Sequence, residues 1–406
     1  MKRILLTEGT SLTARETITS LRASGYEIDI LSSDRLPLSA FSRWKHRIIP
    51  TVNPNEDPEQ YLGHISNLLR SGNYVAVVPT HEQAWLLAEG RKLLPPNPPI
   101  ALAPTSAFRQ VQGKSSFASL ADKLGIPVPR WEKVNKGASI GISYPYWLKS
   151  DFGTAGRSVC KVRSDEEKGK AFLLLSPDNG QLMAQEHISG HYGQVEAAFA
   201  QGKMIAAHTT MSRAVGAGGS AAARLSVDDP ETREHIERIG GHLDWNGCLT
   251  LDFIRSNNKL YYIECNPRMI EPANAAESGV NFAEILIEMS SGQPLPAHVR
   301  VGKAGVKTHS IMALLLGAAE QTGSRKALAR VLREYMTSSG LFENSTEVLT
   351  PIGQDPSSLV PLVATAFGLL INPQRSEKTV AKAVEHYRIQ PETIRAVREL
   401  ADKARQ

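Results

Sequence analysis

The sequence predicts an α/β protein of several domains: a parallel, doubly wound layer, then an α+β unit, then a mostly helical region. Short apolar strands alternate with helices over residues 1–105, which is the pattern of a parallel sheet. From residue 106 to about 300, strands follow one another closely and are separated by glycine turns. Helical periodicity dominates residues 301–406, apart from a looser stretch near 341–357. A chain of 406 residues is also too long for one compact core.

The first unit, residues 1–105, has the strand–helix alternation of a Rossmann-like layer. Its first turn, "TEGTSLTA", has one glycine instead of the pattern GxGxxG, so no dinucleotide site is expected there. The expected strands cover residues 3–7, 26–33, 46–51, 74–80 and 99–105, and the expected helices run to about residue 23, near 58–71 and near 81–93.

The second unit, residues 106–300, combines helices with short strands. "KSSFASLADKLGIPVP" places apolar residues at helical spacing, and Gly125 and Pro127 end that helix. A later helix lies in "DDPETREHIERIGGHL", where Asp229 suits the N-cap and Pro230 the first helical position. Strands are expected in "YPYWLKS", "SVCKVRS", "QLMAQEHIS", "GQVEAAFA" and "KMIAAHTTMS".

Composition and charge narrow the class of protein. With 41 % hydrophobic and 21 % charged residues, the chain has the balance of a soluble globular protein. Its net charge is +5, but the lysines and arginines are scattered, so nucleic acid is not expected as a partner. The three cysteines, Cys160, Cys248 and Cys265, form no CxxC pair and are expected to be reduced core residues.

No segment is expected to enter or cross a membrane. The basic start "MKRILLTEG" has too short an apolar run for a signal peptide, and no run approaches the ~20 apolar residues of a membrane span. The longest run, "LVPLVATAFGLLI" at 359–371, is interrupted by Pro361 and is expected to be a buried helix. A cytoplasmic location is therefore expected.

One predicted hairpin carries the most informative acidic residues. "GCLTLDFIRSNNKLYYIECNP" indicates two antiparallel strands joined by the turn "SNNK". With the turn centred on Asn258, Asp252 lies opposite Glu264, and cross-strand partners point to the same side of a sheet. Strand alternation places Tyr262 and Asn266 on the side of Glu264, and Ile263 and Cys265 on the other side.

The cluster of Asp252, Glu264 and Asn266 suits a hard cation. Two close carboxylates repel each other unless a cation lies between them, and Mg²⁺ is typically bound by one or two carboxylates together with substrate phosphates. Mn²⁺ prefers the same oxygen ligands. Arg268, just past the second strand, would face a transferring phosphoryl group or a developing oxyanion. The alternative is a solvated surface hairpin in which Arg268 pairs with Glu264.

A second motif, "WLKSDFGTAGRSV", indicates a phosphate site. Lys149 ends a strand, and Gly153 and Gly156 lie in a turn whose backbone amides can surround a phosphate. The Walker A pattern GxxxxGK[ST] is absent, and a hairpin loop with a surface lysine is the alternative. Lys114 starts a helix, where its charge opposes the helix dipole, which favours another role for it.

A third stretch, "AQEHISGHYGQVE", combines an apolar strand, Glu186 and a glycine turn. Exposed backbone at such a strand end can pair with the edge of adenine. An ordinary edge strand explains the same residues, so both interpretations stay open at this point.

In order and spacing these motifs resemble the ATP-grasp superfamily over residues 1–300, most closely the ligases similar to carbamoyl-phosphate synthase domains and biotin carboxylase. "GKSSFASLADKLGIPVP" and "YPYWLKSDFGTAGRSV" resemble the segments of its two phosphate lysines, and "AQEHISG" its adenine hinge. "LDWNGCLTLDFI" and "LYYIECNPR" resemble its metal strands, and "NPRMIEPANAAESGVNFAEILIEMSSG" continues its pattern. The implied domains are a Rossmann-like domain at 1–105, an ATP-grasp domain at 106–300 with a lid at about 126–187, and a helical region at 301–406.

The resemblance implies an ADP-forming carboxylate–amine ligase that uses ATP and Mg²⁺. A carboxylate would become an acyl phosphate, Arg268 would stabilise the transition state, and an amine of a small metabolite or amino acid would displace phosphate. The other implied contacts are Lys114, Lys149, Gly153 and Gly156 with phosphates, Asp252, Glu264 and Asn266 with two Mg²⁺, and Glu186 with the backbone of His187 to Ser189 around adenine.

The chain also departs from the family. Tyr192 occupies the position of the glutamate that takes the ribose hydroxyls, and Gln194 or Glu196 would have to substitute for it. The glycine loop has fewer glycines than that of biotin carboxylase, and the chain has no biotin-attachment motif. A bicarbonate-activating or carbamoyl-forming enzyme and a non-catalytic ATP sensor therefore stay open as alternatives.

The substrate is the least determined part. Arg213 and Arg224 flank a glycine-rich loop in "HTTMSRAVGAGGSAAARLS" and would be placed to grip a substrate carboxylate. A mobile surface loop is the alternative. Residues 301–406 show no chemistry of their own, and we expect a docking element, a homodimer contact or a cover for the active site.

Overall fold

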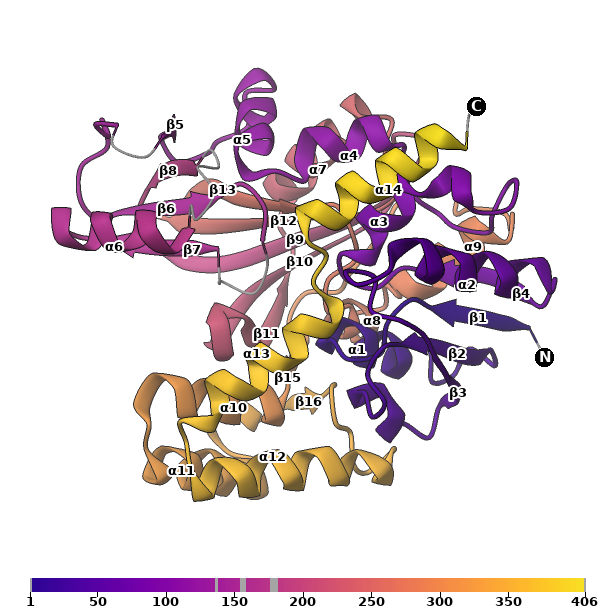
Figure 1. Cartoon of the computed structure of the whole chain (residues 1–406). Helices are drawn as coiled ribbons and strands as arrows, with labels where there is room; N and C mark the ends of the chain where they lie inside the picture. The colour runs from indigo at the N-terminus through magenta and orange to yellow at the C-terminus, as the bar shows by residue number, and fades with distance from the viewer. Residues whose placement is uncertain (1, 136–137, 154–157, 176–181, 405–406) are drawn as a thin grey trace.

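The computed structural model describes residues 2–135, 138–153, 158–175 and 182–404 (Figure 1). Its first layer is a parallel sheet in the order β3-β2-β1-β4, which confirms the predicted α/β layer. The strands are β1 (Arg3–Leu6), β2 (Glu27–Ser32), β3 (Lys45–Pro50) and β4 (Tyr74–Val78), and the helices are α1 (Leu12–Ser20), α2 (Pro58–Arg70) and α3 (Gln83–Glu89).

The strand expected at 99–105 is wrong, because that segment forms no regular ladder. It makes one bond of the strand type, from the Val77 amide to the Pro99 carbonyl (2.8 Å). Prolines at 98, 99 and 104 have no amide hydrogen to donate, so they cannot continue a ladder. Helix α4 (Thr105–Val111) begins directly after this segment and is followed by α5 (Lys114–Lys123).

The middle of the chain forms a mixed sheet of eight strands in the order β13-β12-β9-β10-β11-β15-β16, with β14 beside β10. Helices α7 (Pro230–His242), α8 (Ala273–Glu277) and α9 (Phe282–Ser290) pack against it. Asp229 caps α7, and its side chain accepts from the Thr232 amide, as predicted. The strands are β9 (His191–Ala200), β10 (Lys203–Val215), β11 (Ala221–Val227), β12 (Gly247–Ser256), β13 (Lys259–Asn266), β14 (Arg300–Val301), β15 (Lys307–His309) and β16 (Ser345–Glu347).

The β12–β13 hairpin pairs Asp252 with Glu264, as predicted, but Ser256 pairs with Lys259, so the turn is not centred on Asn258 as expected. Asn257 and Asn258 form its tight turn and both have positive φ (46° and 63°), which asparagine tolerates better than most residues. This turn alone would place Asp252 opposite Ile263, but one extra residue in β13 places Glu264 opposite Asp252 instead. The two carboxylates therefore form a cross-strand pair near the end of β13.

The predicted faces of β13 are wrong at one point. The register shifts between Asp252 and Phe253, so Ile263 is an extra residue in β13, a β-bulge. Beyond the bulge Tyr262 is fully buried in the same apolar cluster as Cys265. Ile263 instead lines the cavity together with Glu264. Alternation from sequence alone cannot show such a bulge.

A separate antiparallel sheet, β5-β8-β6-β7, lies at the left of Figure 1 within the residues expected to form the lid. We call it the lid sheet, and its role as a lid stays a prediction. It has its own small apolar core, in which Tyr146 and Leu148 pack beneath helix α6 (Asp165–Leu175). Its strands are β5 (Trp131–Val134), β6 (Tyr146–Ser150), β7 (Val159–Val162) and β8 (Leu182–Glu186).

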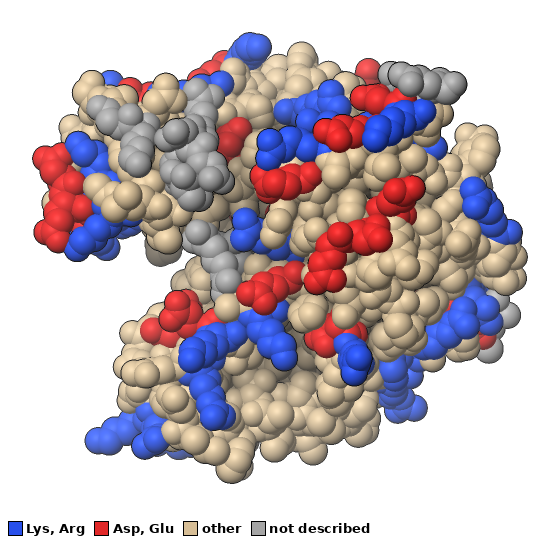
Figure 2. Space-filling model, in the orientation of Figure 1, with Lys and Arg blue, Asp and Glu red and all other residues tan. Residues whose placement is uncertain are grey.

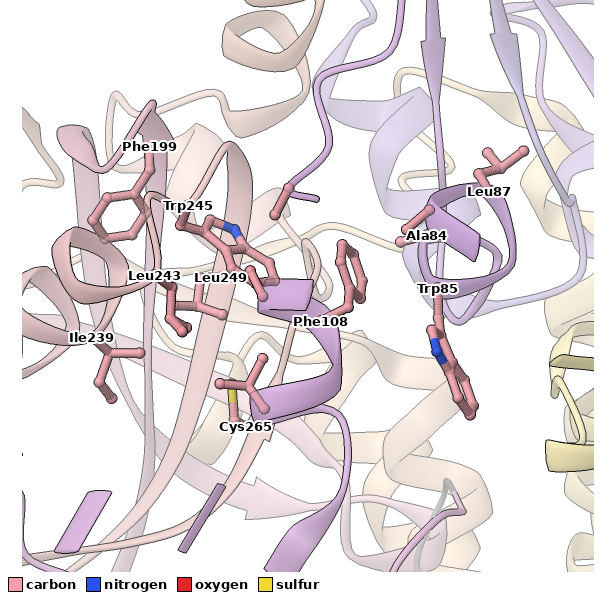
Figure 3. Packing of buried hydrophobic residues seen from close by; sticks show 14 of the residues in the cluster. Ala84, Trp85, Leu87, Phe108, Phe199, Ile239, Leu243, Trp245, Leu249 and Cys265 are labelled. Carbon is pink, nitrogen blue, oxygen red and sulfur yellow. The ribbon is translucent and has the colours of Figure 1, made fainter. Parts of the chain in front are cut away.

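The largest core joins the first layer to the central sheet (Figure 3). Phe108 of α4 lies against Trp245, with ring centroids 5.1 Å apart. Leu249 and Cys265 of the hairpin strands belong to the same cluster, as does Trp85 of α3. The strands that carry the acidic pair are therefore anchored from behind by a continuous apolar core.

The region 301–406 is mostly helical, as predicted, but it is not an isolated unit. Two of its strands, β15 and β16, join the central sheet, and α14 packs on α2 and α3 (Figure 1). A buried ion pair between Arg15 and Asp355 (2.7 Å) ties it to α1. The boundaries near 105 and 300 therefore stay predictions. The helices are α10 (Ile311–Thr322), α11 (Arg325–Met336), α12 (Leu359–Ile371), α13 (Arg375–Tyr387) and α14 (Pro391–Lys403).

Helix α12 is where the apolar run was expected, but the prediction that it is buried is wrong. Leu362 and Leu369 face a core, whereas Val363 and Phe367 are 53 % and 64 % exposed. The short helix lies at the edge of the molecule, so one face has nothing to pack against among the described residues. Among the residues that the structure describes, no helix is both long and apolar enough to span a membrane.

Candidate active site

One cavity of about 1080 Å³ lies where the lid sheet, the central sheet, the N-terminal loops and the C-terminal helices meet. Figure 2 shows this face hollowed between the lobe at upper left, which holds the lid sheet, and the lower lobe of C-terminal helices. The volume is at the upper limit of pockets for one small molecule (~300–1,000 Å³), so it has room for more than one reactant.

The acidic pair forms part of the cavity wall. Asp252 is buried, and its carboxylate accepts hydrogen bonds from Gln194 Nε2 (2.9 Å) and Asn266 Nδ2 (3.3 Å). Glu264 forms an ion pair with Lys114, whose Nζ lies 3.2 Å from Oε1. The alternative of a solvated surface hairpin, in which Arg268 would pair with Glu264, is therefore wrong, because Glu264 pairs with Lys114.

The electrostatics of this pair favour a bound cation. Burial first, and the nearby Glu264 carboxylate second, raise the pKa of Asp252 to about 7. A divalent cation between the two carboxylates would remove that repulsion. No group of three or more His, Cys, Asp and Glu side chains suited to a metal is found in the described part of the chain. Two carboxylates and the Asn266 amide fit Mg²⁺ only when phosphates complete the ligand set, which is how Mg²⁺ is usually held.

Two buried lysines lie beside the acidic pair. Lys114 Nζ also donates to the Gly153 carbonyl (3.3 Å), and Lys149 Nζ donates to Gln185 Oε1 (2.6 Å) and to the Ile263 carbonyl (3.3 Å). Burial lowers the pKa of Lys149 to about 8. Because desolvation disfavours its charge, this ammonium gains from any anion that enters the cavity.

Arg268 completes the charged wall. Its side chain is 9 % exposed and lines the cavity, and its guanidinium has no hydrogen bond or ion pair within the described residues. His81, which also lines the cavity, is buried against Tyr387 with ring centroids 4.2 Å apart. Burial, together with the charge of Arg268, lowers the pKa of His81 well below its usual range, so the imidazole is neutral.

The expected nucleotide hinge lines the same cavity. Glu186 is the last residue of β8, His187 and Ser189 follow it, and all three line the cavity. His187 accepts from Trp147 Nε1 (3.1 Å). Gly153 also lines the cavity, with φ of 137°, whereas the other loop glycine expected from sequence, Gly156, lies outside the described residues.

Of the three residues considered for contact with the ribose, two line the main cavity and one does not. Tyr192 and Gln194 line the main cavity, and Gln194 donates a hydrogen bond to Asp252. Glu196 points elsewhere: it is buried, accepts from the Ile270 amide (3.2 Å), and burial raises its pKa well above the usual range. The structure therefore does not bring Glu196 to the cavity.

The two arginines expected at the substrate are not brought together. A register shift next to Arg213 breaks the β10–β11 ladder, and its guanidinium donates to the Leu341 carbonyl (3.1 Å) away from the cavity. Arg224 lines the cavity, but it forms a short ion pair with Glu271. A joint grip by Arg213 and Arg224 on one carboxylate is therefore not what the structure shows.

A buried carboxyl behind this ion pair makes stability depend on pH. Glu16 accepts from the Ala273 amide (3.1 Å), and burial, followed by the charge of Glu271, raises the pKa of Glu16 to about 8. Between the ordinary value of 4.5 and about 8 the folded protein holds a proton that the unfolded chain has lost, so stability falls as pH rises through this range.

We expect Glu16→Gln to make the stability depend less on pH in this range. Melting temperatures from pH 5 to 9, with Glu59→Gln as the exposed control, check this, and parallel curves for wild type and Glu16→Gln would contradict it.

Several cavity residues carry no signal in the sequence. Glu271 follows Arg268 by three residues and is recognisable only from the structure. His81 and Tyr387 are 306 positions apart in the numbering. The contact between their rings depends on where the tertiary fold places α13 relative to the first layer. The C-terminal helices that line the cavity likewise show helical periodicity but no chemistry.

Residues 112–272 match the family model described as an ATP-grasp domain. Among curated proteins, the multifunctional protein pyr-3 of Neurospora crassa is 23 % identical over 220 residues, which cover 48 % of this chain and 12 % of that protein. This chain therefore matches only about an eighth of that relative's length.

Solved structures share the fold at low identity. N5-carboxyaminoimidazole synthetase from Staphylococcus aureus in complex with ADP is 16 % identical, with a TM-score of 0.60 over 79 % of this chain and 86 % of that one. L-amino acid ligase from Bacillus licheniformis is 16 % identical, with a TM-score of 0.55 over 71 % and 74 %. The family model and the shared fold confirm the predicted ATP-grasp resemblance and the predicted fold class.

Proposed function

We propose that this chain, whose residues 112–272 match an ATP-grasp domain, is an ATP- and Mg²⁺-dependent ligase that activates a carboxylate as an acyl phosphate and joins it to an amine. One observation carries the proposal: the Asp252–Glu264 pair, two buried lysines and Arg268, which has no partner among the described residues, converge on one wall of a single cavity. A site with this many fixed charges suits a polyphosphate and its cation.

The proposed roles follow from these positions. Lys114 and Lys149 contact phosphates, and Asp252, Glu264 and Asn266 hold Mg²⁺, which when bound neutralises phosphate charge. Glu186 and the backbone of His187 to Ser189 hold the adenine, and Tyr192 or Gln194 meets the ribose. Arg268 faces the phosphoryl group in transfer.

The proposed reaction consists of two successive displacements. A carboxylate oxygen of the substrate attacks the γ-phosphorus of ATP, and ADP leaves. The amine nitrogen then attacks the acyl carbon and phosphate leaves, because a phosphate is a far better leaving group than the original oxide. The amine loses a proton in this second step. Small-molecule partners and a homodimer are part of the proposal, and sedimentation velocity would test the dimer.

The proposal is tested by incubating the protein with MgATP, pooled carboxylates and hydroxylamine. Hydroxylamine traps any acyl phosphate as a hydroxamate, so the true amine need not be known. Formation of hydroxamate with equal ADP and phosphate supports the ligase. Formation of AMP contradicts the acyl-phosphate step. Nucleotide binding with no turnover would favour the ATP sensor, and ATP hydrolysis stimulated by bicarbonate alone would favour the carboxylase alternative.

Lys149 gives a direct test of nucleotide binding. Lys149→Met should weaken ADP binding by about ten- to a hundredfold, since a hydrogen bond to a charged group contributes roughly 1.5–3 kcal/mol. Titration calorimetry with MgADP measures this. Lys133→Met, at an exposed position of the lid sheet, is the matched control and should bind as wild type does. Equal affinity of both variants would remove Lys149 from the phosphate site.

A further inference from the structure

We propose that the carboxylate substrate is a monocarboxylic acid with an apolar body, such as a medium-chain or aryl-substituted acid. Its body would lie in an apolar compartment of the cavity between the N-terminal loops and the C-terminal helices. The inference rests on the proposed function, which it deepens by naming the class of acid.

Charge is unevenly distributed around the cavity. Every Asp, Glu, Lys and Arg among its described lining residues lies between positions 114 and 271. The lining residues from 10–41 and from 312–383 include none. A second carboxylate, a phosphate or an ammonium on the far end of the substrate would have no charged partner in that part of the cavity, and burying an unpaired charge is costly. The charged lining residues are Lys114, Lys149, Glu186, Arg224, Asp252, Glu264, Arg268 and Glu271.

The uncharged part of the wall is continuous. The 3₁₀ turn Leu38–Phe41 contacts α12, and α12 and α13 both contact α10. Helix α13 also contacts the short turn Ala217–Gly219 that follows β10. These elements therefore enclose one compartment. Its apolar side chains outnumber the uncharged hydroxyl side chains of Thr10, Ser11, Thr13, Thr365 and Thr379. The apolar side chains are Leu12, Leu36, Leu38, Phe41, Met312, Ala313, Leu316, Val360, Pro361, Ala364, Val380 and Ala383.

This compartment includes apolar side chains that remain exposed to solvent in the folded chain. Leu36 is 64 % exposed and Val360 is 55 % exposed, and both line the cavity. Covering such groups with an apolar ligand is favourable because it removes their surface from water. The apolar run of α12, which the sequence predicts to be buried, thus presents Val360, Pro361 and Ala364 to the cavity.

Helix α13 connects this compartment to the charged wall. Val380, Ala383 and Tyr387 all line the cavity and follow the i, i+3, i+7 spacing of one helix face. The ring of Tyr387 contacts that of His81 at a tilt of 49°, and the pKa of His81 responds to the charge of Arg268. At 1.5 Å per residue, Val380 to Tyr387 spans about 10 Å. A carboxylate at the Arg268 end would therefore have an apolar path of this length for its body.

Competing acids test the inference. Octanoate, phenylacetate, succinate and bicarbonate are each offered with MgATP and hydroxylamine, and hydroxamate is measured. We expect kcat/KM for octanoate or phenylacetate to exceed that for succinate by about tenfold or more, the scale of discrimination that apolar pockets provide. Hydroxamate formed mainly from succinate, or turnover with bicarbonate alone, would overturn the inference while leaving ATP-dependent activation in place.

A binding measurement separates this inference from the proposed function. Octanoate is titrated into the MgADP-loaded protein. Binding without any hydroxamate would support the compartment and contradict the ligase reaction. No binding would overturn the compartment whatever the enzyme does.

Neighbouring residues of α12 provide the matched variants. Ala364→Asp places a charge in the compartment and should weaken octanoate binding by about tenfold or more, with MgADP affinity unchanged. Val363→Asp adds the same charge at an exposed position that does not line the cavity, and should bind octanoate as wild type does. Equal weakening in both variants, or in neither, would overturn the placement of the apolar body.

Discussion

Replacing Glu264 with glutamine is expected to lower kcat for ATP turnover by about a thousandfold without unfolding the protein. Glu264 and Asp252 are the two carboxylates of the proposed cation site, and they lie opposite each other on β12 and β13. Glutamine keeps the size of the side chain but removes one of two negative charges that hold Mg²⁺ against the phosphates. Charge stabilisation by a metal and fixed groups commonly supplies several kcal/mol of the barrier reduction, which is a factor of this size.

The measurement is phosphate and ADP release, with hydroxamate formation in parallel. Circular dichroism and a cooperative melt show whether the variant is folded. Glu234→Gln is the matched control: Glu234 is exposed on α7 and pairs with Arg238, so turnover should not change. A Glu264→Gln variant with turnover within tenfold of wild type would show that the acidic pair does not hold the metal.

The acidic hairpin shows what the sequence can predict. The predicted pair of Asp252 and Glu264 is correct only because two departures from the expected hairpin cancel: the turn lies at Asn257 and Asn258 instead of being centred on Asn258, and an extra residue in β13 restores the pair. The bulge at Ile263 arises from how β12 and β13 pair, and no residue near Ile263 predicts it from the sequence. The bulge changes the side on which Tyr262 lies, and it also brings Glu264 opposite Asp252.

The substrate side shows why the rest could not be predicted. Arg213 and Arg224 are close in sequence and on neighbouring strands, yet a register shift directs one of them to the Leu341 carbonyl. The apolar lining comes from segments more than 250 positions apart, such as Leu38 and Pro361. Periodicity identifies such helices as amphipathic or apolar. It cannot say which face meets a cavity, since that depends on tertiary packing.

The sequence could not predict that one face of α12 is exposed. An apolar segment of 13 residues is normally assigned to a core, and half of this helix is indeed packed against one. The other half borders the cavity or the surface because the chain offers no further element to cover it within the described residues. An apolar helix face can either pack into a core or remain open for binding. A prediction that assigns every apolar segment to a core therefore fails at binding sites.

Arg268→Met is expected to lower kcat and kcat/KM together by at least about a hundredfold, while the melting temperature of the ligand-free protein stays the same or rises. The guanidinium is buried, lines the cavity and has no hydrogen bond or ion pair among the described residues. An unpaired buried charge costs stability in the free protein, and methionine removes that cost with a side chain of similar length. An equal loss in kcat and kcat/KM marks an interaction made in the transition state alone.

Arg268→Lys separates charge from geometry. A lysine keeps the positive charge but loses the planar fork that meets two phosphoryl oxygens at once, so we expect it to recover only part of the lost kcat. Arg224→Met provides the comparison, because Arg224 already pairs with Glu271 and its loss leaves a buried carboxylate without that partner. We therefore expect Arg224→Met to lower the melting temperature and Arg268→Met not to do so. If Arg268→Met instead destabilises the free protein and leaves kcat unchanged, Arg268 is a structural residue and the transferring phosphoryl group must be stabilised by the two lysines and the metal alone.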